Sequence, residues 1–194
     1  MTLKIEPLSI PDVLLVTPRR FADSRGYFVE TYTQRSFHQA GITPSFRQDN
    51  QSLSTQRGTI RGLHFQLAPE PQTKLVRVLA GSVYDVAVDL RHGSATYGQW
   101  CGATLTADVG EELLIPAGFA HAFCTLEPDT IVAYKVDGFY NKAAEGGLRW
   151  DDPDIGIDWP VPAAEIKVSE KDAALPFLRD AATPFDFATT FPGS

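Results

Sequence analysis

The chain contains few cysteines and no long apolar stretch. Only two of its 194 residues are cysteine, Cys101 and Cys124, which is too few for a disulfide framework. We interpret both as free thiols in a reducing compartment, with a single bridge as the less favoured alternative. No segment approaches the roughly 20 apolar residues that span a membrane, and the first residues lack the apolar core of a signal peptide. The sequence therefore predicts a cytoplasmic protein that does not bind membranes.

Basic residues are outnumbered by acidic ones, 17 against 24, which gives a net charge of -7. Binding to nucleic acid requires a basic surface, so we expect no nucleic-acid partner. The negative net charge does not exclude an anionic small molecule as the ligand, because the electrostatic field inside a pocket depends on local cations. The hydrophobic content of 43% and charged content of 21% are typical of a folded globular protein. Residues 1–194 are predicted to form one domain.

Several motifs that announce a particular chemistry are also missing. The sequence has neither a Gly-x-Gly-x-x-Gly nor a Walker loop, so it indicates no dinucleotide or ATP site. It has neither a Gly-x-Ser-x-Gly elbow nor a reactive-cysteine signature, so covalent acyl chemistry is unsupported. The acidic run from Asp151 to Asp154 lacks the ligand spacing of an EF-hand, and we interpret it as a turn.

What the chain does contain is a series of short apolar segments separated by Gly, Pro, Asp and Asn. This spacing, without long helical patterns between the segments, predicts an all-β fold of the sandwich or barrel type. A short helix is expected at Gln34–Ala40, capped by Thr33, and another from Ser169 toward Leu178. Ala80-Gly81 is typical of a tight hairpin. The predicted strands are Val13–Thr17, Tyr27–Tyr32, Phe46–Ser52, Thr59–Phe65, Lys74–Leu79, Ser82–Leu90, Gln99–Thr106, Glu112–Ile115, Ala120–Leu126 and Thr130–Val136.

Cations gather around one histidine in the segments Arg57–Gln66 and Lys74–Arg77. Apolar alternation at Leu63 and Phe65 turns His64 to the opposite face of its strand. A histidine that projects into a barrel beside fixed cations can take a proton from a polarised, anionic substrate. The alternative is a buried histidine with a purely structural hydrogen bond.

Two histidines raise the question of a metal. Pro116–His121 is similar to the second motif of the cupin barrels, many of which bind a metal, and their first motif supplies a His-x-His pair and a glutamate. Here the matching positions read His64-Phe65-Gln66, so two of those ligands are missing. A catalytic metal usually has about three protein ligands, whereas His64 and His121 supply two. We therefore expect a cupin-like β-barrel (jelly roll), with short peripheral helices and a C-terminal extension, that uses no metal or other cofactor.

Eight short segments follow one another in an order that is far more specific than any one of them. They are Asp23–Glu30, Gln48–Ser52, Arg61–Gln66, Gln72–Val76, Asp85–Arg91, Ile115–His121, Trp150–Pro153 and Ser169–Asp172. With these segments the chain resembles the dTDP-4-dehydrorhamnose 3,5-epimerase family over nearly its whole length. Ala122 departs from the family, which usually has glycine after this histidine, and we expect the change to affect local packing more than chemistry.

The resemblance implies a substrate with a ketone at sugar carbon 4 and acidic C–H bonds at carbons 3 and 5. His64 matches the base, with Asp172 holding its tautomer, although the spacing of Asp172 from Ser169 also suits a helix-capping carboxylate. Tyr134 matches the acid, against the alternative of a core aromatic. Lys74 matches the group that stabilises the enolate, with help from His121, against the alternative of a solvated lysine.

The resemblance also implies binding residues and an assembly. Arg61 and Lys171 would contact the diphosphate or the sugar. Because the N-terminal arm of this family reaches the neighbouring subunit's site, a homodimer with shared sites is expected. The other residues assigned to the nucleotide and sugar are Arg25, Phe28, Glu30, Gln48, Asn50 and Glu145.

The predicted function is metal-independent epimerisation at carbons 3 and 5 of a dTDP-4-keto-6-deoxy sugar, in deoxysugar biosynthesis. The nearest alternative is an enzyme of the same family that inverts one carbon only, or a ketoisomerase. A metal-dependent cupin and a non-catalytic sugar-nucleotide-binding module are the alternatives from other classes.

Overall fold

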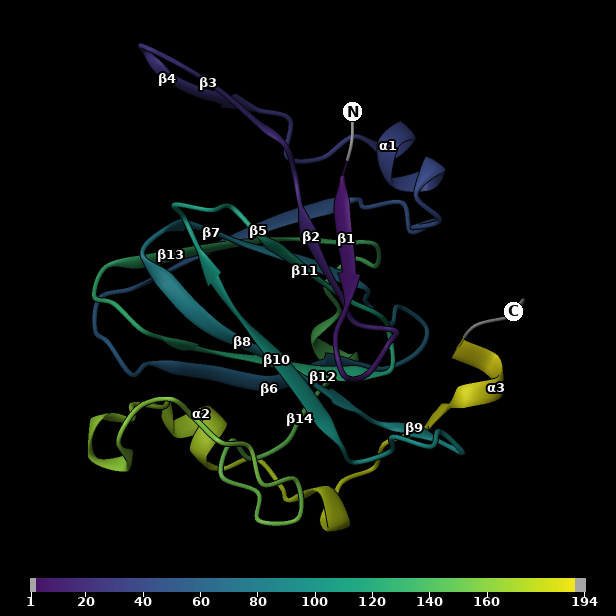
Figure 1. Cartoon of the computed structure of the whole chain (residues 1–194). Coiled ribbons are helices and arrows are strands. Elements are labelled where there is room, and N and C mark those ends of the chain that lie inside the picture. The colour runs from purple at the N-terminus through teal and green to yellow at the C-terminus, as the bar shows by residue number, and fades with distance from the viewer. Residues whose placement is uncertain (1–2, 191–194) are drawn as a thin grey trace.

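Two antiparallel sheets stacked face to face form the body of the molecule (Figure 1). The computed structural model describes residues 3–190. One sheet has the strand order β1 (Lys4–Pro7), β2 (Leu14–Thr17), β11 (Glu112–Ile115), β7 (Lys74–Ala80), β13 (Thr130–Val136), β5 (Gln48–Ser54). The other has the order β10 (Trp100–Thr106), β8 (Ser82–Asp89), β12 (Phe119–Thr125), β6 (Ile60–Gln66), β14 (Glu145–Gly147). This jelly roll of two sheets confirms the predicted fold class.

The predicted strands are present, and two of them, Glu112–Ile115 and Thr130–Val136, have the predicted bounds. One inference about connection was wrong. Ala80-Gly81 does not close a hairpin, because β7 and β8 lie in different sheets. Gly81, at φ +76°, instead carries the chain from one sheet to the other, and a Cβ there would lie 2.4 Å from Oγ1 of Thr130.

The core between the sheets is made by side chains that alternate along the strands. Val76 and Val78 of β7 face Val83 and Ala87 of β8 in one buried cluster, together with Phe123 of β12. The side chains that alternate with them along β7 point to the outer face of the six-stranded sheet, where Leu75 belongs to another cluster. The inner face of each sheet therefore supplies the core and, at one end, the polar groups of the site described below.

The predicted C-terminal extension is present, and it covers the five-stranded sheet (Figure 1). Leu148, Ile155 and Phe185 are buried against strands β6, β8 and β12. The acidic run forms the predicted turn, since the buried Asp152 accepts hydrogen bonds from the amides of Asp154 (2.8 Å) and Leu178 (2.6 Å). The remaining elements are β9 (Arg91–His92), which pairs with β15 (Phe185–Asp186), α3 (Phe187–Thr190) and the 3₁₀ helices Lys142–Ala144, Ala163–Glu165 and Leu178–Asp180.

Two short helices lie at the positions the capping signals indicated. α1 (Gln34–Gln39) begins at Thr33, whose hydroxyl accepts a hydrogen bond from the amide of Ser36. α2 (Glu170–Ala173) begins at Ser169 but ends well before the predicted limit near Leu178. The single turn of α2 lies beside β6. It positions Lys171 and Asp172 in the site described below.

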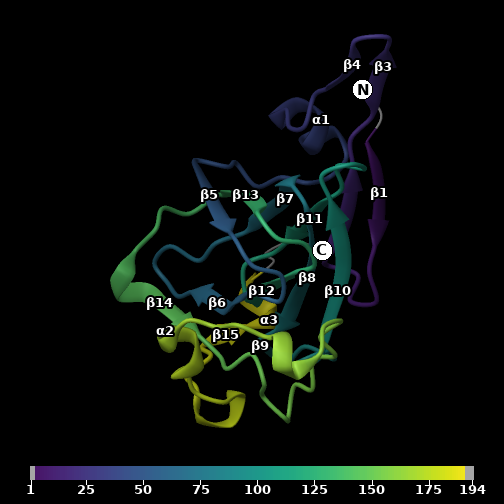
Figure 2. The same ribbon diagram turned by 90° about the vertical axis from the view of Figure 1, so that its left-hand side faces the viewer.

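A two-stranded hairpin, β3 (Arg20–Asp23) and β4 (Gly26–Val29), extends away from both sheets (Figures 1 and 2). Its aromatic side chains are exposed, with Tyr27 at 57% and Phe28 at 67% of full exposure. Exposed aromatic side chains on a projecting hairpin are typical of a surface that contacts another molecule.

Both cysteines are buried and free, as predicted. Burial raises the pKa of each thiol, Cys101 and Cys124, to about 11, so neither is a reactive thiolate at neutral pH. Within residues 3–190, no helix has the length and apolar character needed to cross a bilayer.

Gly62 in β6 lies in close contact with β12. Its φ is +123°, and a Cβ would lie 2.5 Å from the Cβ of Ala122 and 2.5 Å from the carbonyl oxygen of His121. Ala122 itself is buried in the core of the five-stranded sheet, where its methyl group contributes to packing, and the absence of an effect on chemistry stays a prediction. We predict that Gly62→Ala lowers the free energy of unfolding by about 3 kcal/mol, from overpacking and an unfavourable φ.

Urea denaturation checks this prediction, with Gly41→Ala as the matched control. Gly41 also has a positive φ, +85°, but a Cβ there would meet nothing within 4 Å. The control should therefore lose only about 1 kcal/mol, from backbone strain. Equal losses in the two variants would show that the contact with Ala122 is not what requires glycine at position 62.

Candidate active site

A cavity of about 500 Å³ opens between the two sheets at one end of the molecule. Its walls come from both sheets and from α2 with the segment before it, so residues far apart in the sequence meet there. It brings together seven residues predicted from the sequence: Arg61, His64, Lys74, His121, Tyr134, Lys171 and Asp172. Its other lining residues are Ser52, Thr59, Ile60, Phe123, Lys167, Val168 and Ser169.

His64 and Asp172 form a hydrogen-bonded pair in this cavity. Nε2 of His64, on β6, lies 2.8 Å from Oδ1 of Asp172, on α2. The side chain of His64 remains 32% exposed, whereas that of Asp172 is 6% exposed. Burial alone would raise the pKa of Asp172, but the hydrogen bond and charge of His64 and the amide of Gly62 lower it below its ordinary value. Asp172 is therefore a buried carboxylate that fixes the orientation of an accessible imidazole.

The helix-capping alternative for Asp172 is wrong in one respect. Ser169 caps α2 by accepting a hydrogen bond from the backbone amide of Asp172, at 3.0 Å. The carboxylate does not complete the capping box, because its second oxygen, Oδ2, accepts from the amide of Gly62 at 3.5 Å. The cap thus holds the backbone of Asp172 in place while the carboxylate is directed to β6.

A second histidine–aspartate pair lies beside the first. His121 on β12 is the cross-strand partner of His64, and its Nε2 is 3.0 Å from Oδ1 of Asp85 on β8. Burial lowers the pKa of His121, against the attraction of Asp85. Sequence analysis did not select Asp85, although a carboxylate in the apolar strand Ser82–Asp89 was a detectable signal, because such a group requires a partner.

Lys74 is a buried amine, and the solvated alternative is wrong. The residue is 8% exposed, and its Nζ donates a hydrogen bond to the carbonyl oxygen of His64 at 3.2 Å. Burial lowers the pKa of Lys74 to about 8, although Asp85 and Glu145 favour the charged form. The amine is thus largely cationic at neutral pH, in a place where water screens its charge poorly.

Tyr134 faces this group of residues from the other sheet. It lies on β13, in the six-stranded sheet, whereas His64 and His121 lie in the five-stranded sheet. Burial raises the pKa of Tyr134, against the opposing effect of Arg61. The phenol is therefore protonated at neutral pH and lines the cavity opposite the imidazole.

A smaller hollow of about 120 Å³ adjoins the first, and His64, Lys74 and Tyr134 line both. Here Gln48 donates to Oδ1 of Asn50 at 2.8 Å and accepts from the amide of Tyr140 at 3.0 Å. Glu145 completes the wall. The hollow thus gathers three more predicted residues, Gln48, Asn50 and Glu145.

Tyr140 in this hollow was missed by the sequence analysis. Its hydroxyl lies 3.4 Å from Oε2 of Glu145, and it is 56% exposed. Lys171 donates to Oε1 of Glu145 at 2.7 Å, and this bond is the main reason that the pKa of Glu145 is lowered. The only signal for Tyr140 in the sequence was an aromatic residue in a polar stretch, which is a weak one.

The cavity also carries cations. Arg61 donates hydrogen bonds to the hydroxyl of Ser54 and to the carbonyl oxygen of Leu53, both at 3.1 Å. These bonds orient its guanidinium without cancelling its charge. Lys167, which the sequence analysis did not select, lines the same cavity. An anionic group would therefore find fixed positive charges beside the histidines.

Three of the predicted binding residues line neither the cavity nor the adjoining hollow. Arg25 and Phe28 lie on the projecting hairpin, and Glu30 follows it. Arg25 is paired with Asp23 at 2.6 Å, on an exposed surface. Within one chain, these residues are separated from the residues around His64.

A catalytic metal needs about three protein ligands close together. In the part of the chain that the structure describes, no three His, Cys, Asp or Glu residues are grouped as a metal site requires. Nε2 of His64 and Nε2 of His121 are each directed at a carboxylate, those of Asp172 and Asp85.

Comparisons with known proteins agree with one another. A family model described as dTDP-4-dehydrorhamnose 3,5-epimerase matches residues 7–180. The protein of that name from Sinorhizobium fredii is 48% identical over 182 residues, which are 94% of this chain and 93% of that protein. The Bacillus anthracis structure of that name, with TDP and PPi bound, is 48% identical with a TM-score of 0.87, covering 91% of this chain and 99% of that one.

A solved 3'-monoepimerase is similar as well, at lower identity. The Streptomyces bikiniensis structure, in complex with dTDP-quinovose, is 33% identical with a TM-score of 0.82. The match covers 90% of this chain and 87% of that chain. The same fold therefore occurs among enzymes named for one inversion and among those named for two.

Proposed function

The chain belongs to the dTDP-4-dehydrorhamnose 3,5-epimerase family, and from this we propose that it inverts carbons 3 and 5 of a dTDP-4-keto-6-deoxy sugar without a metal. The observation that carries the proposal is the placement of an imidazole and a phenol on opposite sheets of one cavity, with a buried ammonium beside them. Inversion needs a base on one face of a carbon and an acid on the other.

In the first step, His64 removes the proton from a carbon next to the ketone. Its exposed ring can reach a substrate, and Asp172 holds it at 2.8 Å. The electron pair of the broken C–H bond moves into an enolate, while the imidazole becomes an imidazolium. The carboxylate of Asp172 stabilises that positive charge, because it is buried and ionised.

The enolate oxygen is stabilised by Lys74, with help from His121. The ammonium of Lys74 is held in place through the carbonyl oxygen of His64. Since it is already oriented and largely shielded from water, its attraction for the oxygen strengthens as negative charge develops there. His121 is positioned by Asp85 beside it.

In the last step, Tyr134 returns a proton from the opposite face. A phenol whose pKa is raised by burial keeps its proton at neutral pH and gives it only to a strong base such as an enolate carbon. The configuration at that carbon is inverted. Before the other carbon beside the ketone is inverted, the imidazolium must lose its proton to solvent, the phenolate must regain one, and the sugar must present that carbon to the same two groups.

The remaining groups suit the rest of a dTDP-sugar. Arg61 and Lys171 would hold the diphosphate or the sugar, since both line the large cavity. Gln48, Asn50 and Glu145 would contact the sugar nucleotide in the adjoining hollow. The flat ring of Tyr140 offers a surface for the base.

A homodimer with shared sites accounts for the hairpin. Arg25, Phe28 and Glu30 are separated from the cavity of their own chain, so they can serve the nucleotide only in the site of a second copy. We propose that the reaction takes place in the cytoplasm, where the free thiols of Cys101 and Cys124 would stay reduced.

Proton NMR of the substrate in deuterium oxide tests the proposed reaction. We expect deuterium at both carbon 3 and carbon 5, because the same base and acid serve both positions. Incorporation at one carbon alone would favour the single inversion that the Streptomyces bikiniensis protein is named for. Nucleotide binding without any incorporation would instead indicate a non-catalytic module.

The activity should fall as pH rises through about 8. The pKa of Lys74 is lowered to about 8, so the cation that stabilises the enolate is present below that pH and lost above it. A profile of kcat/KM against pH measures this alkaline limb. In Lys74→Arg the limb should disappear, because a guanidinium stays charged, and a limb that persists there would belong to another group.

A further inference from the structure

The segment 138–141 leads from β13 to the 3₁₀ helix Lys142–Ala144, and its residue Tyr140 forms part of the wall of the smaller hollow. The segment lies in neither a helix nor a strand. The side chains of Phe139 and Tyr140 are more than half exposed, at 53% and 56%. Side chains this exposed contribute little packing that could hold a loop in place. The backbone of the segment is instead held from the inside, by hydrogen bonds.

Gln66 is the central group of this arrangement. It lies at the end of β6 and is 5% exposed. Its Nε2 donates to the carbonyl oxygen of Phe139 at 2.8 Å, and its Oε1 accepts from the amide of Asn141 at 2.8 Å. Nε2 also donates to the carbonyl oxygen of Glu70. One buried side chain therefore bonds the backbone on both sides of Tyr140 and ties it to the loop before β7.

Two further glutamines bond the same segment. Nε2 of Gln72 donates to the carbonyl oxygen of Gly138 at 2.9 Å, and Oε1 of Gln48 accepts from the amide of Tyr140 at 3.0 Å. The close fit extends to the backbone, since a Cβ on Gly138 would lie 2.8 Å from the carbonyl oxygen of Pro71. Each of four consecutive residues thus shares a hydrogen bond with a glutamine side chain. The segment has a fixed backbone beneath exposed aromatic rings.

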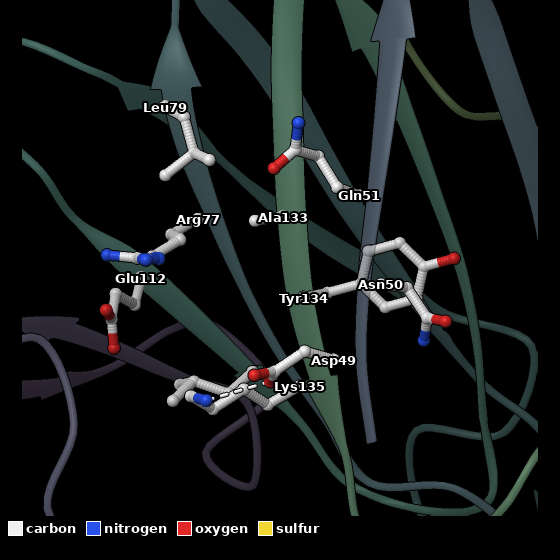
Figure 3. A pocket seen from close by; sticks show the side chains of 10 residues that line it. Asp49, Asn50, Gln51, Arg77, Leu79, Glu112, Ala133, Tyr134 and Lys135 are labelled. Atoms are coloured by element: carbon white, nitrogen blue, oxygen red, sulfur yellow. Dashed lines mark hydrogen bonds and ion pairs between the residues drawn. The ribbon is translucent and has the colours of Figure 1, made fainter.

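Gln48 also connects the segment to the catalytic phenol. Its Nε2 donates to Oδ1 of Asn50 at 2.8 Å. Asn50 on β5 is the cross-strand partner of Tyr134 on β13, and Figure 3 shows these two side chains next to each other. Both residues line the hollow as well as the cavity drawn in Figure 3. The position of Tyr140 relative to Tyr134 is therefore set by Gln48 and by the pairing of β5 with β13.

The pattern of these bonds matches the chemistry of an amide. A glutamine side chain offers a donor and an acceptor at once, and it carries no charge. Gln66 uses both, because a carbonyl group and an amide of the same segment face it. A carboxylate would lack the donor, and an ammonium would lack the acceptor. An apolar side chain of the same length would supply neither.

We propose that these three glutamines form a clasp that fixes residues 138–141 before the nucleotide binds, with Gln66 as the central positioning residue. A segment that is already ordered loses less conformational entropy when a ligand binds. The clasp raises the affinity for dTDP through the ring of Tyr140 and leaves the chemistry at His64 unchanged. This inference rests on the proposed function, in which that ring faces the base of the nucleotide.

Gln66→Met tests the clasp, because methionine has a similar length, lacks the amide group and brings no charge near His64. The dissociation constant of dTDP, from calorimetric titration, should rise about tenfold. KM for the dTDP-sugar should rise with it, whereas kcat should not change. An unchanged dissociation constant, or a loss that appears in kcat and not in KM, would overturn the clasp.

The matched control is Gln99→Met. Gln99 also donates to a carbonyl oxygen in a loop, that of Ala95 at 3.4 Å, but it is exposed and lines neither the cavity nor the hollow. This variant should bind dTDP as the wild type does. A loss equal to that of Gln66→Met would show that the bonds to residues 138–141 are not what matters.

Amide hydrogen exchange of the free protein, followed by NMR, reports whether the segment is released. The amides of Tyr140 and Asn141 should exchange about tenfold faster in Gln66→Met than in the wild type. The amide of Leu178, which is bonded to Asp152 in the C-terminal extension, is the reference and should keep its rate. Equal acceleration of all three amides would indicate a general loss of stability and would contradict a local clasp.

A double-mutant cycle tests whether Gln66 acts through Tyr140. Tyr140→Ala removes the ring, so Gln66→Met in that background should cost no further affinity for dTDP. A further loss of about tenfold there would refute this route. Gln72→Met covers the case in which Gln66→Met does not fold, because it removes only the bond to Gly138. It should weaken dTDP binding about threefold, and wild-type affinity in this variant would count against the clasp.

The clasp and the proposed function can fail separately. Binding of dTDP and amide exchange require no turnover, whereas deuterium incorporation into the sugar depends on His64. Incorporation without the expected effects of Gln66→Met would refute the clasp alone. The expected effects on dTDP binding without incorporation would refute the proposed reaction alone.

Discussion

Replacing His64 by asparagine should abolish the exchange of the substrate's protons with deuterium oxide while leaving dTDP binding unchanged. General-base catalysis by a positioned side chain contributes about 10²- to 10⁴-fold. Among the described residues that line the cavity, no other group is both accessible and paired with a buried carboxylate. The amide of Gly62 still donates a hydrogen bond to Oδ2 of Asp172, at 3.5 Å. The buried carboxylate therefore keeps a partner, and the variant should fold.

The matched control is His38→Asn, which removes an exposed imidazole from α1. Its exchange rate and its affinity for dTDP should equal those of the wild type. Calorimetric titration with dTDP separates binding from chemistry in each variant. If His64→Asn still exchanges protons at the wild-type rate, another group is the base, and the proposed mechanism fails at its first step.

The sequence predicts the long strands of this fold well and its short ones poorly. β13, seven residues long, alternates between buried and half-buried positions over most of its length, so its bounds could be read directly. β1, β9 and β14 are short segments whose strand character comes from pairing with distant residues. The turn at Gly81 was recognised, but local signals do not determine which sheet the next strand joins.

The site shows the same division between local and distant information. Alternation in β6 indicated where His64 points, whereas its contact with Asp172 joins residues 108 positions apart. That partner, and Tyr134, came only from the resemblance to a family. Asp85 and Tyr140 were missed, because a single carboxylate in a strand or an aromatic in a loop gains its meaning from neighbours that the fold supplies.

Replacing Tyr134 by phenylalanine should separate proton exchange from inversion. The variant keeps the aromatic ring, so the wall of the cavity is preserved, and it loses only the hydroxyl that returns a proton. His64 can still remove a proton and return a deuteron from the same face. We therefore expect label to enter the substrate at an appreciable rate, while the epimerised product falls by about 10²- to 10⁴-fold.

The measurement is one NMR time course, in which label and configuration are followed together. Tyr97→Phe is the control, because its hydroxyl lies 3.2 Å from Thr183, outside the catalytic cavity, and it should invert the substrate normally. The outcome distinguishes a phenol that acts as the acid from one that only shapes the cavity. A packing role would lower exchange and inversion together or leave both intact, whereas retention of exchange with loss of inversion requires that the two sheets deliver protons to opposite faces of the sugar.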